Sequence, residues 1–303
     1  MILVSGLVNI ETNLKIEGFP LNYYPVCFPF FGIKSNVSGV GTNIAKALTK
    51  LGSEISFLSL IGRDLDADLV IMDFQQHTID TNYLLPQLDE TSKTVILFDH
   101  EGKRQIHCDL KDLQEQSYPK ELFLRQLEAS NLAILTPLNY NREFLMIAKS
   151  MNKLIATDLH VINSIHDAYN RDFMEYADIL FFSNESVFGR EESFIKELAN
   201  AFNSRIIVCG MGKDGSFLYV REEGTITHIE AVYVRPVVNT IGAGDALFSA
   251  FIHFYLKGDS PREALEKATY FAAYKIGESG ASLGFLSEAE LNTYYAKCNF
   301  IKK

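Results

Sequence analysis

The sequence lacks the features by which several classes of protein are recognised. Its four cysteines form no Cys-x-x-Cys spacing and no close pair, which indicates a reduced, cytoplasmic protein without a disulfide framework. No apolar run reaches the roughly 18 residues of a membrane-spanning helix, and Met1–Gly6 has neither the charged nor the long apolar region of a signal peptide. No basic block interrupts the net charge of −10. These absences predict no membrane partner and no nucleic-acid partner.

The sequence also has no internal repeat, and its 303 residues are 47% hydrophobic, which is enough to bury a large core. Apolar strand-like runs alternate with amphipathic helical periods over most of its length. The clearest strands are expected at 132–135, 154–157, 179–183 and 205–209, and the clearest helices at 120–129, 142–150 and 191–202. This alternation is typical of an α/β fold with a mainly parallel sheet and helices on both faces.

Two regions do not fit this alternation. Short extended pieces are expected in the first region, and a hairpin with an Asp-x-x-Gly turn is expected in the second. The expected strands are Leu14–Ile16, Val26–Phe31, Thr94–Phe98 and Arg104–Cys108. We expect these regions, approximately 12–36 and 92–109, to form a small β-sheet that covers one end of a single domain spanning residues 1–303.

The most informative stretch runs from Val237 to Ile252. A β-branched run enters a turn that contains Gly242 and Gly244, and the turn opens onto an apolar segment, so a strand, a tight loop and a buried helix are expected. The glycines allow successive N–H groups to point at one position, and the helix N-terminus adds its positive dipole. The loop is therefore expected to bind an anion. Asp245 could cap the helix or take a proton from an attacking hydroxyl, and the residues alone leave both roles open.

Three further stretches accompany this loop. Ser38–Asn43 precedes a predicted helix, Asn184-Glu185 follows a predicted strand, and Gly212–Gly215 follows the next strand. Together with Asn239–Asp245 they resemble, in order, the motifs of the ribokinase or PfkB family of carbohydrate and nucleoside kinases. That family's patterns are Gly-Gly-x-x-x-Asn, Asn-x-x-Glu, Gly-x-x-Gly and Asp-Thr-x-Gly-Ala-Gly-Asp. The resemblance covers nearly the whole chain and implies a ribokinase-like, doubly wound α/β fold with a small β lid.

The same resemblance implies an ATP-dependent phosphotransferase that moves the γ-phosphoryl group to a hydroxyl of a sugar or a sugar-containing small molecule. Asp245 would be the base, and the N–H groups of Gly242, Ala243 and Gly244 would stabilise the transferring charge. The implied substrate contacts are Asn9, Glu11, Gly39 and Asn43, and the implied nucleotide contacts are Asn184, Gly212, Lys213, Gly215 and Thr240. ATP and Mg²⁺ are the implied cofactors.

The sequence departs from the family's motifs at three positions. Asn239 replaces an Asp, Ser38 replaces a Gly, and Val187 replaces the final Glu of Asn-x-x-Glu. Because Val187 cannot orient a hydrated Mg²⁺, Glu185 is the remaining candidate carboxylate, and a weaker anchor for the ion is expected. Some family members also bind K⁺ near their final loop. Ser279–Gly284 is the matching stretch here, and the resemblance leaves this site open.

The sequence does not settle the acceptor. Val40 lies where kinases of ribose and of phosphorylated sugars usually have Lys, and Gly39–Ala45 looks more like the pseudouridine and nucleoside kinases, so a nucleoside is the alternative acceptor. An alternative of another class is a protein that keeps the fold and binds ATP or a sugar without catalysis, which Val187 and Asn239 favour. An NAD site is rejected, because the third glycine of the dinucleotide fingerprint is Ile44.

Three further features have a functional and a structural interpretation. Asp158 could face the cleft or cap the segment that follows, and Lys213 could contact phosphate or be solvated. The seven histidines show no metal-ligand spacing, so His160 and His166 are expected to be structural or exposed. Phe28–Phe31 is apolar and compatible with a homodimer formed through the β lid.

Overall fold

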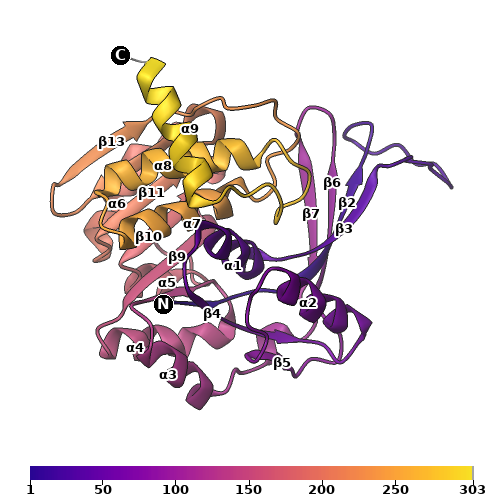
Figure 1. The fold of residues 1–303 in the computed structure, drawn as a ribbon, viewed down its shortest axis with the longest axis horizontal. Coiled ribbons are helices and arrows are strands. Elements are labelled where there is room, and N and C mark those ends of the chain that lie inside the picture. The colour runs from indigo at the N-terminus through magenta and orange to yellow at the C-terminus, as the bar shows by residue number, and fades with distance from the viewer. Residues whose placement is uncertain (302–303) are drawn as a thin grey trace.

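One large sheet organises the computed structural model, which describes the backbone of residues 1–301 and the side chains of residues 1–297. The strands described there lie in the order β13-β12-β11-β10-β9-β8-β1-β4-β5 (Figure 1). They are parallel from β11 to β5, whereas β12 and β13 form an antiparallel edge. The strands are β1 (Ile2–Ser5), β4 (Ile55–Ile61), β5 (Leu84–Pro86), β8 (Leu132–Leu135), β9 (Leu154–Val161), β10 (Ile179–Ser183), β11 (Ile206–Gly210), β12 (Ser216–Val220) and β13 (Thr225–Ile229).

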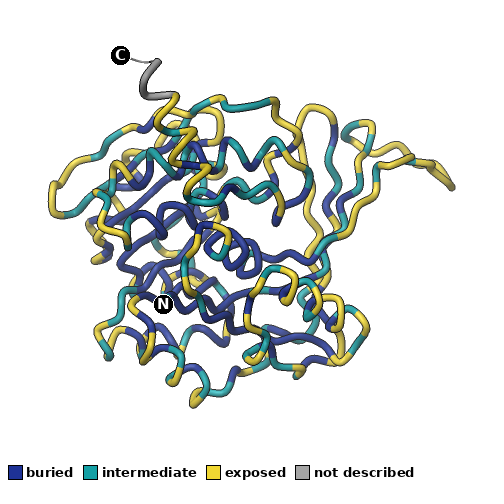
Figure 2. Tube along the Cα trace, viewed as in Figure 1, coloured by how far each residue is buried: buried dark blue, intermediate teal, exposed yellow. Residues whose placement is uncertain are grey.

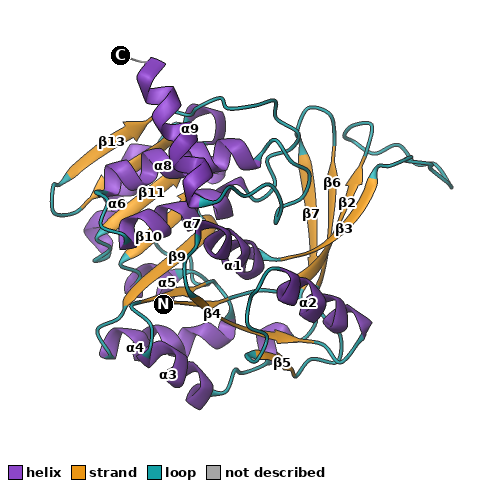
Figure 3. Cartoon of the chain, in the orientation of Figure 1, coloured by secondary structure: helices purple, strands orange, loops and turns teal. Residues whose placement is uncertain are grey.

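Helices cover both faces of this sheet and enclose two cores (Figures 2 and 3). On one face lie α1 (Val40–Leu51), α2 (Leu65–Gln76), α7 (Ala243–Leu256), α8 (Pro261–Lys275) and α9 (Glu288–Ile301), and on the other α3 (Lys120–Glu128), α4 (Arg142–Ser150), α5 (Arg171–Tyr176) and α6 (Glu191–Ala201). In β1, Ile2 and Val4 pack into the first core and Leu3 into the second. Because the inner strands are buried on both sides, their sequences are continuously apolar. The predicted doubly wound α/β fold is confirmed.

A second sheet, which we call the β lid, stands at one end of the large one (Figure 1). Its strands are ordered β3-β2-β6-β7, and β2 pairs with β6 in parallel while the other pairs are antiparallel. The strands are β2 (Asn9–Lys15), β3 (Ile33–Ser38), β6 (Lys93–Phe98) and β7 (Arg104–Asp109). Along β2, the side chains of Asn9, Glu11 and Asn13 share one buried face. A buried row of polar side chains needs partners, and those partners lie in the site described below.

Two sequence predictions about strands were wrong. Val26–Phe31 is not a strand: residues 16–32 form a protruding, largely exposed loop, and the strand lies at Ile33–Ser38 because its backbone pairs with β2. Val237-Val238 is not a strand either. The N–H groups of Val238 and Asn239 both donate to the carbonyl of Ile276, at 2.8 and 3.2 Å, so the end of α8 takes the place of a neighbouring strand.

The other predicted helices and strands are present, and they differ from the prediction mainly in the residues at which they begin and end. β9 continues four residues beyond the expected end at Thr157, as far as Val161, and this extension carries polar side chains beyond the edge of the core. The helices expected after residues 120, 142 and 191 and the hairpin of β6 and β7 are present. No helix in the described part of the chain is long and apolar enough to cross a membrane.

Candidate active site

The N-terminus of α7 is the centre of the candidate site. Gly242 caps this helix with φ of +74°, a left-handed conformation that glycine adopts without strain. A Cβ atom at this position would lie 2.6 Å from the carbonyl oxygen of Ala281, so the available space also requires glycine. Because α7 packs between α1 and α8, its first turn is held in a fixed direction.

The N–H groups of this turn differ in whether they are free to donate a hydrogen bond to a ligand. Gly244 and Asp245 lie in the first turn of α7, where the helix itself offers no acceptor. The Gly242 N–H also has no acceptor among the described residues, whereas the Ala243 N–H donates to the Thr240 carbonyl at 3.2 Å. An anion at this helix end can therefore accept from Gly242 and Gly244 directly, and from Ala243 only if its bond to Thr240 lengthens.

Asp245 is held next to these N–H groups by a contact from another helix. Its side chain is 8% exposed, and its Oδ2 accepts a hydrogen bond of 2.7 Å from Nδ2 of Asn43 on α1. Burial raises the pKa of Asp245 above its ordinary value, against the opposing influence of His160 and of the Asn43 bond, and the charge of Asp158 adds to the rise. A carboxylate with a raised pKa is a better proton acceptor, which is the property that a general base needs.

A row of hydrogen bonds continues from Asn43 into the β lid. The Ser38 hydroxyl lies 3.0 Å from Asn43 Oδ1 and 2.9 Å from Glu11 Oε2, and Asn13 Nδ2 donates to Glu11 Oε1 at 2.8 Å. All of these side chains are buried. Ser38, which replaces a glycine of the family motif, therefore links the lid to the base. Sequence reasoning missed Asn13, although its place two residues after Glu11 on one strand was a usable signal.

Two amide oxygens beside this row have no partner. Asn9 Nδ2 donates to Thr94 Oγ1 at 2.6 Å, but Oδ1 of Asn9 and Oδ1 of Asn13 accept no bond from any described residue although both are buried. Buried acceptors without donors are rare, because each costs about 1–3 kcal/mol. A ligand that brings hydroxyl donors would satisfy both oxygens.

Gly39 has a structural reason to be glycine. Its φ is +103°, and a Cβ atom there would lie 2.6 Å from the Leu7 carbonyl oxygen and 3.2 Å from the Asn9 nitrogen. The close approach of these two segments brings the start of α1, with Asn43, against the start of β2. Direct access of a substrate to the Gly39 backbone stays a prediction.

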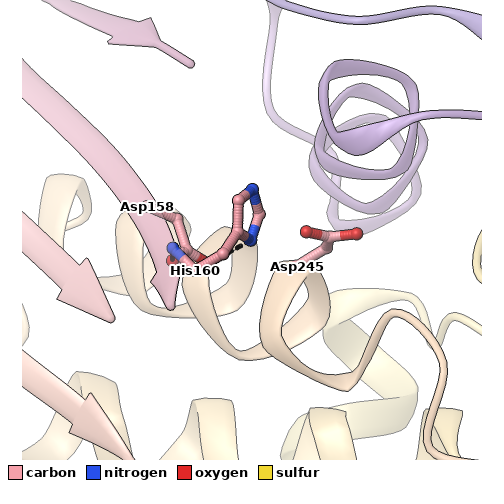
Figure 4. A group of neighbouring side chains, drawn as sticks. All are labelled: Asp158, His160 and Asp245. Atoms are coloured by element: carbon pink, nitrogen blue, oxygen red, sulfur yellow. Dashed lines mark hydrogen bonds and ion pairs between the residues drawn. The ribbon is translucent and has the colours of Figure 1, made fainter. Parts of the chain in front are cut away.

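Two residues at the end of β9 join the site. Asp158, His160 and Asp245 place one ligand-type atom each within 4.8 Å of one another (Figure 4). Asp158 Oδ1 accepts the His160 N–H at 2.9 Å where the register of β9 with β10 shifts, and His160 there has φ of +59°. Asp158 lies near Asp245, and because its carboxylate bonds the backbone within β9 it caps no following element of the described chain. His160 was expected to be structural or exposed; its ring is 44% exposed, but it faces Asp245, a placement that a sequence without metal-ligand spacing did not reveal.

A family model described as pfkB family carbohydrate kinase matches residues 1–288. The chain belongs to this family. Ribokinase from Dictyostelium discoideum is 22% identical over 322 residues, covering 96% of this chain and 99% of that protein. The acarbose 7(IV)-phosphotransferase of Actinoplanes sp. is 24% identical, with 96% of both chains covered.

Solved structures agree on the fold. A microbiome-derived acarbose kinase superposes with a TM-score of 0.87 at 23% identity, covering 97% of this chain and 98% of that one. A Burkholderia thailandensis nucleoside kinase in complex with inosine gives a TM-score of 0.81 at 17% identity, with 98% of both chains covered. At these identities the likeness shows the ribokinase fold, and the family match shows that the chain is a carbohydrate kinase of the sugar or nucleoside type.

The predicted nucleotide contacts of this PfkB-family kinase lie in three places, and one of them, Thr240, precedes α7 and accepts the Ala243 N–H. Gly212 and Lys213 belong to a short exposed turn after β11, and Lys213 borders a shallow hollow shared with Phe217 and His228. Gly215 ends the turn with φ of +89°, and a Cβ atom there would overlap the Ile229 carbonyl, so this glycine is required by packing. The side chain of Lys213 forms no ion pair with a described residue, and its contact with phosphate stays a prediction.

The third place is the end of β10. Asn184 Nδ2 donates to Glu191 Oε1 at 2.8 Å, and this bond lowers the pKa of Glu191. Glu185 is exposed and pairs with Arg104 of the β lid at 3.2 Å. Val187 is 1% exposed and packs in the core, so the final Glu of the family motif has no counterpart there, and Glu191 supplies the carboxylate that contacts Asn184.

Proposed function

We propose that this kinase transfers the γ-phosphoryl group of ATP to a hydroxyl of a sugar or sugar-containing small molecule, with Asp245 as the base. The observation that carries the proposal is the buried row of hydrogen bonds from Asn13 through Glu11, Ser38 and Asn43 to Asp245. This row ends at a helix N-terminus with open N–H groups. Polar side chains suited to a polyol thus lie next to the carboxylate that we propose as the base and the N–H groups that we propose as the anion site.

The reaction divides among these groups as follows. An acceptor hydroxyl placed against Asp245 gives its proton to the carboxylate while its oxygen attacks the γ-phosphorus, and ADP leaves on the opposite side. Asn43 holds the carboxylate of Asp245 in place through its 2.7 Å bond. The N–H groups of Gly242 and Gly244, with the dipole of α7, stabilise the negative charge on the transferring oxygens.

ATP and Mg²⁺ are the cofactors we propose, since kinases of the ribokinase family use them. The donor set at the end of β10 fits Mg²⁺, because Glu185 and Glu191 are carboxylates near the surface and Asn184 has an amide oxygen. Mg²⁺ bound to ATP neutralises phosphate charge. Glu185 would need to exchange Arg104 for a water of the ion, which makes this the weaker of the two carboxylate contacts.

A nucleoside acceptor is the second candidate, and the shape of the β lid favours it. Phe19, Pro20 and Leu21 of the loop before β3 line a hollow together with Lys103 and Arg104 at the turn into β7. Lys103 Nζ lies 5.6 Å from the centre of the Phe19 ring. An apolar hollow of this kind suits a base or a second ring attached to the phosphorylated sugar better than it suits a free pentose.

The β lid also supports a proposed homodimer. Phe28, Phe30 and Phe31 are 74%, 84% and 100% exposed on the loop between β2 and β3. Large exposed aromatic groups of this density mark contact surfaces. Light scattering on the wild type and on a Phe28→Ser/Phe30→Ser variant tests this, and a monomeric mass for the wild type at working concentration rejects the dimer.

The test of the proposed function is an acceptor screen with ATP and Mg²⁺, with and without K⁺, across pentoses, hexoses, oligosaccharides and nucleosides. ADP release and phosphorylated product are measured for the wild type and for Asp245→Asn. Turnover by the wild type and its loss in the variant are expected. If the wild type binds an acceptor in calorimetry but turns over none, the binding-protein alternative is correct.

A further inference from the structure

Lys275 is a buried lysine with no role in the reaction proposed above. It occupies the last turn of α8, its side chain is 0% exposed, and its Nζ donates to the carbonyl oxygen of Ile241. No carboxylate of a described residue forms an ion pair with it. Lysines are almost never fully buried without such a pair, so this placement requires an explanation.

The other buried lysine provides the comparison. Lys46 on α1 is 2% exposed, donates to the Val37 carbonyl at 2.9 Å and pairs with Asp73 at 2.6 Å. Its charge is neutralised by direct contact. Lys275 has no such contact with a described residue. The carboxylates of Asp245 and Glu11, both in the candidate active site, favour its charge from a distance and Arg104 opposes it, whereas Lys46 has Glu11 in addition to its direct partner Asp73.

The bond from Lys275 orients a peptide group of Asn239–Asp245, the loop that we propose binds phosphate and call the phosphate loop. The Ile241 carbonyl and the Gly242 N–H belong to the same trans peptide, so they point in opposite directions. An ammonium group that holds the carbonyl on one side therefore directs the Gly242 N–H to the other side, toward the open end of α7. It also polarises that peptide, because hydrogen bonds in series strengthen one another.

The end of α8 thus holds the loop at two points. The Ile276 carbonyl accepts from Val238 and Asn239, and Lys275 holds Ile241. Asn239, which replaces the Asp of the family signature, brings no negative charge to this side of the loop, and its Oδ1 accepts the Ile241 N–H at 3.2 Å. Lys275 and Asn239 thus contact the same residue, Ile241, and of the two only Lys275 carries a charge.

We propose that the ammonium of Lys275 is a built-in cation of the phosphoryl-transfer site, which orients the Gly242 N–H and makes turnover independent of K⁺. This inference rests on the proposed function. Lys275 is a positioning residue, since it acts through the Ile241–Gly242 peptide and not by touching the substrate.

The first test uses the wild type alone. Turnover of the best acceptor is measured with Mg²⁺ and ATP in a buffer whose monovalent cation is tetramethylammonium, and then with K⁺ added. The expected kcat is the same in both. A kcat that depends on K⁺ overturns the proposal and assigns the cation to the 279–284 stretch.

The second test compares Lys275→Met with Lys46→Met, which removes the charge of the other buried lysine. We expect kcat to fall on the order of 100-fold in Lys275→Met, the loss typical of one displaced oxyanion donor, with little change in the acceptor KM. In Lys46→Met we expect a lower melting temperature and a kcat close to that of the wild type. In Lys275→Ala, added methylammonium should restore part of the lost kcat. Equal losses of kcat in the two Met variants, or no rescue, would assign Lys275 a merely structural role.

A binding measurement decides the question without turnover. Calorimetry gives the affinity of a non-hydrolysable ATP analogue relative to ADP, each with Mg²⁺, and the ratio reports the contribution of the γ-phosphoryl group. We expect this ratio to fall about tenfold, or ~1.4 kcal/mol, in Lys275→Met and to stay unchanged in Lys46→Met. An unchanged ratio in Lys275→Met overturns the proposal. If the Lys275→Met protein does not fold, the same measurement is made on Lys275→Gln. Failure of the acceptor screen would reject the proposed function and leave this ratio as the test of Lys275.

Discussion

Gly242 and Gly244, at the start of α7, have opposite structural requirements, and this gives a sharp test of the proposed phosphate site. Gly242 has φ of +74°, and a Cβ atom there would meet the backbone of Ala281 at 2.6 Å. Gly244 lies in the first turn of α7, and a Cβ atom there would come no closer to the protein than 3.8 Å, at Asp158 Oδ2. Gly242→Ala and Gly244→Ala are therefore a matched pair.

The expected magnitudes follow from the backbone. A left-handed conformation costs a non-glycine residue roughly 1–2 kcal/mol, and the contact with Ala281 forces a backbone shift that costs about 1–3 kcal/mol more. Gly242→Ala should thus lose about 2–5 kcal/mol of stability and, because the N–H moves, about 100-fold in kcat. Gly244→Ala should be neutral or gain up to about 1 kcal/mol, since alanine favours a helix over glycine.

The assay is a thermal melt together with steady-state kinetics on the same preparations. We expect Gly242→Ala to melt about 5 °C or more below the wild type, and Gly244→Ala to melt at or above it. In Gly244→Ala the added methyl group meets only what enters the site, so a loss of kcat with an intact fold indicates that the phosphoryl group lies against residue 244. A wild-type melting temperature and kcat in Gly242→Ala would refute the reasoning, as would a larger destabilisation in Gly244→Ala.

Three other predictions concern the base, the ammonium and the β lid. Asp245→Asn should lower kcat by about 10²–10⁴ while calorimetry still detects acceptor binding, because Asn keeps an oxygen for the bond from Asn43; unchanged turnover would exclude Asp245 as the base. Burial lowers the pKa of Lys275 to about 8, so the active ammonium form is lost as pH rises through about 8, and kcat should fall there in the wild type; a profile flat above that pH in the wild type would contradict this. Arg104→Gln removes the pair with Glu185, which should change stability by less than about 1 kcal/mol and lower the KM for ATP–Mg²⁺, because Glu185 no longer has to give up Arg104 to contact the ion; an unchanged or higher KM would contradict this role of Glu185.

Much of the fold was predictable from the sequence because its cause is local. Continuous apolar runs of four to eight residues between amphipathic helices indicate a parallel sheet covered on both faces, and this pattern needs no knowledge of the partners. The strand at Val26–Phe31 was mispredicted for the converse reason. Its aromatic residues have high strand propensity, but a strand exists only where a neighbour pairs with it, and β2 pairs with Ile33–Ser38.

The sequence by itself determined the loop that opens α7. Gly242 and Gly244 are adjacent to the helix that they open, and Asp245 follows at once, so the spacing alone indicated an anion site beside a carboxylate. The helix dipole and the open N–H groups come with any helix that begins in this way.

Only the tertiary structure decided what surrounds that loop. Asn43 reaches Asp245 from 202 residues away, and His160 reaches it from the end of β9. Lys275 belongs to no motif and would pass for an ordinary last-turn lysine, until α8 packs against α7 and places its ammonium under Ile241. These contacts depend on how helices pack, a property of the whole core, and no spacing along the chain records it.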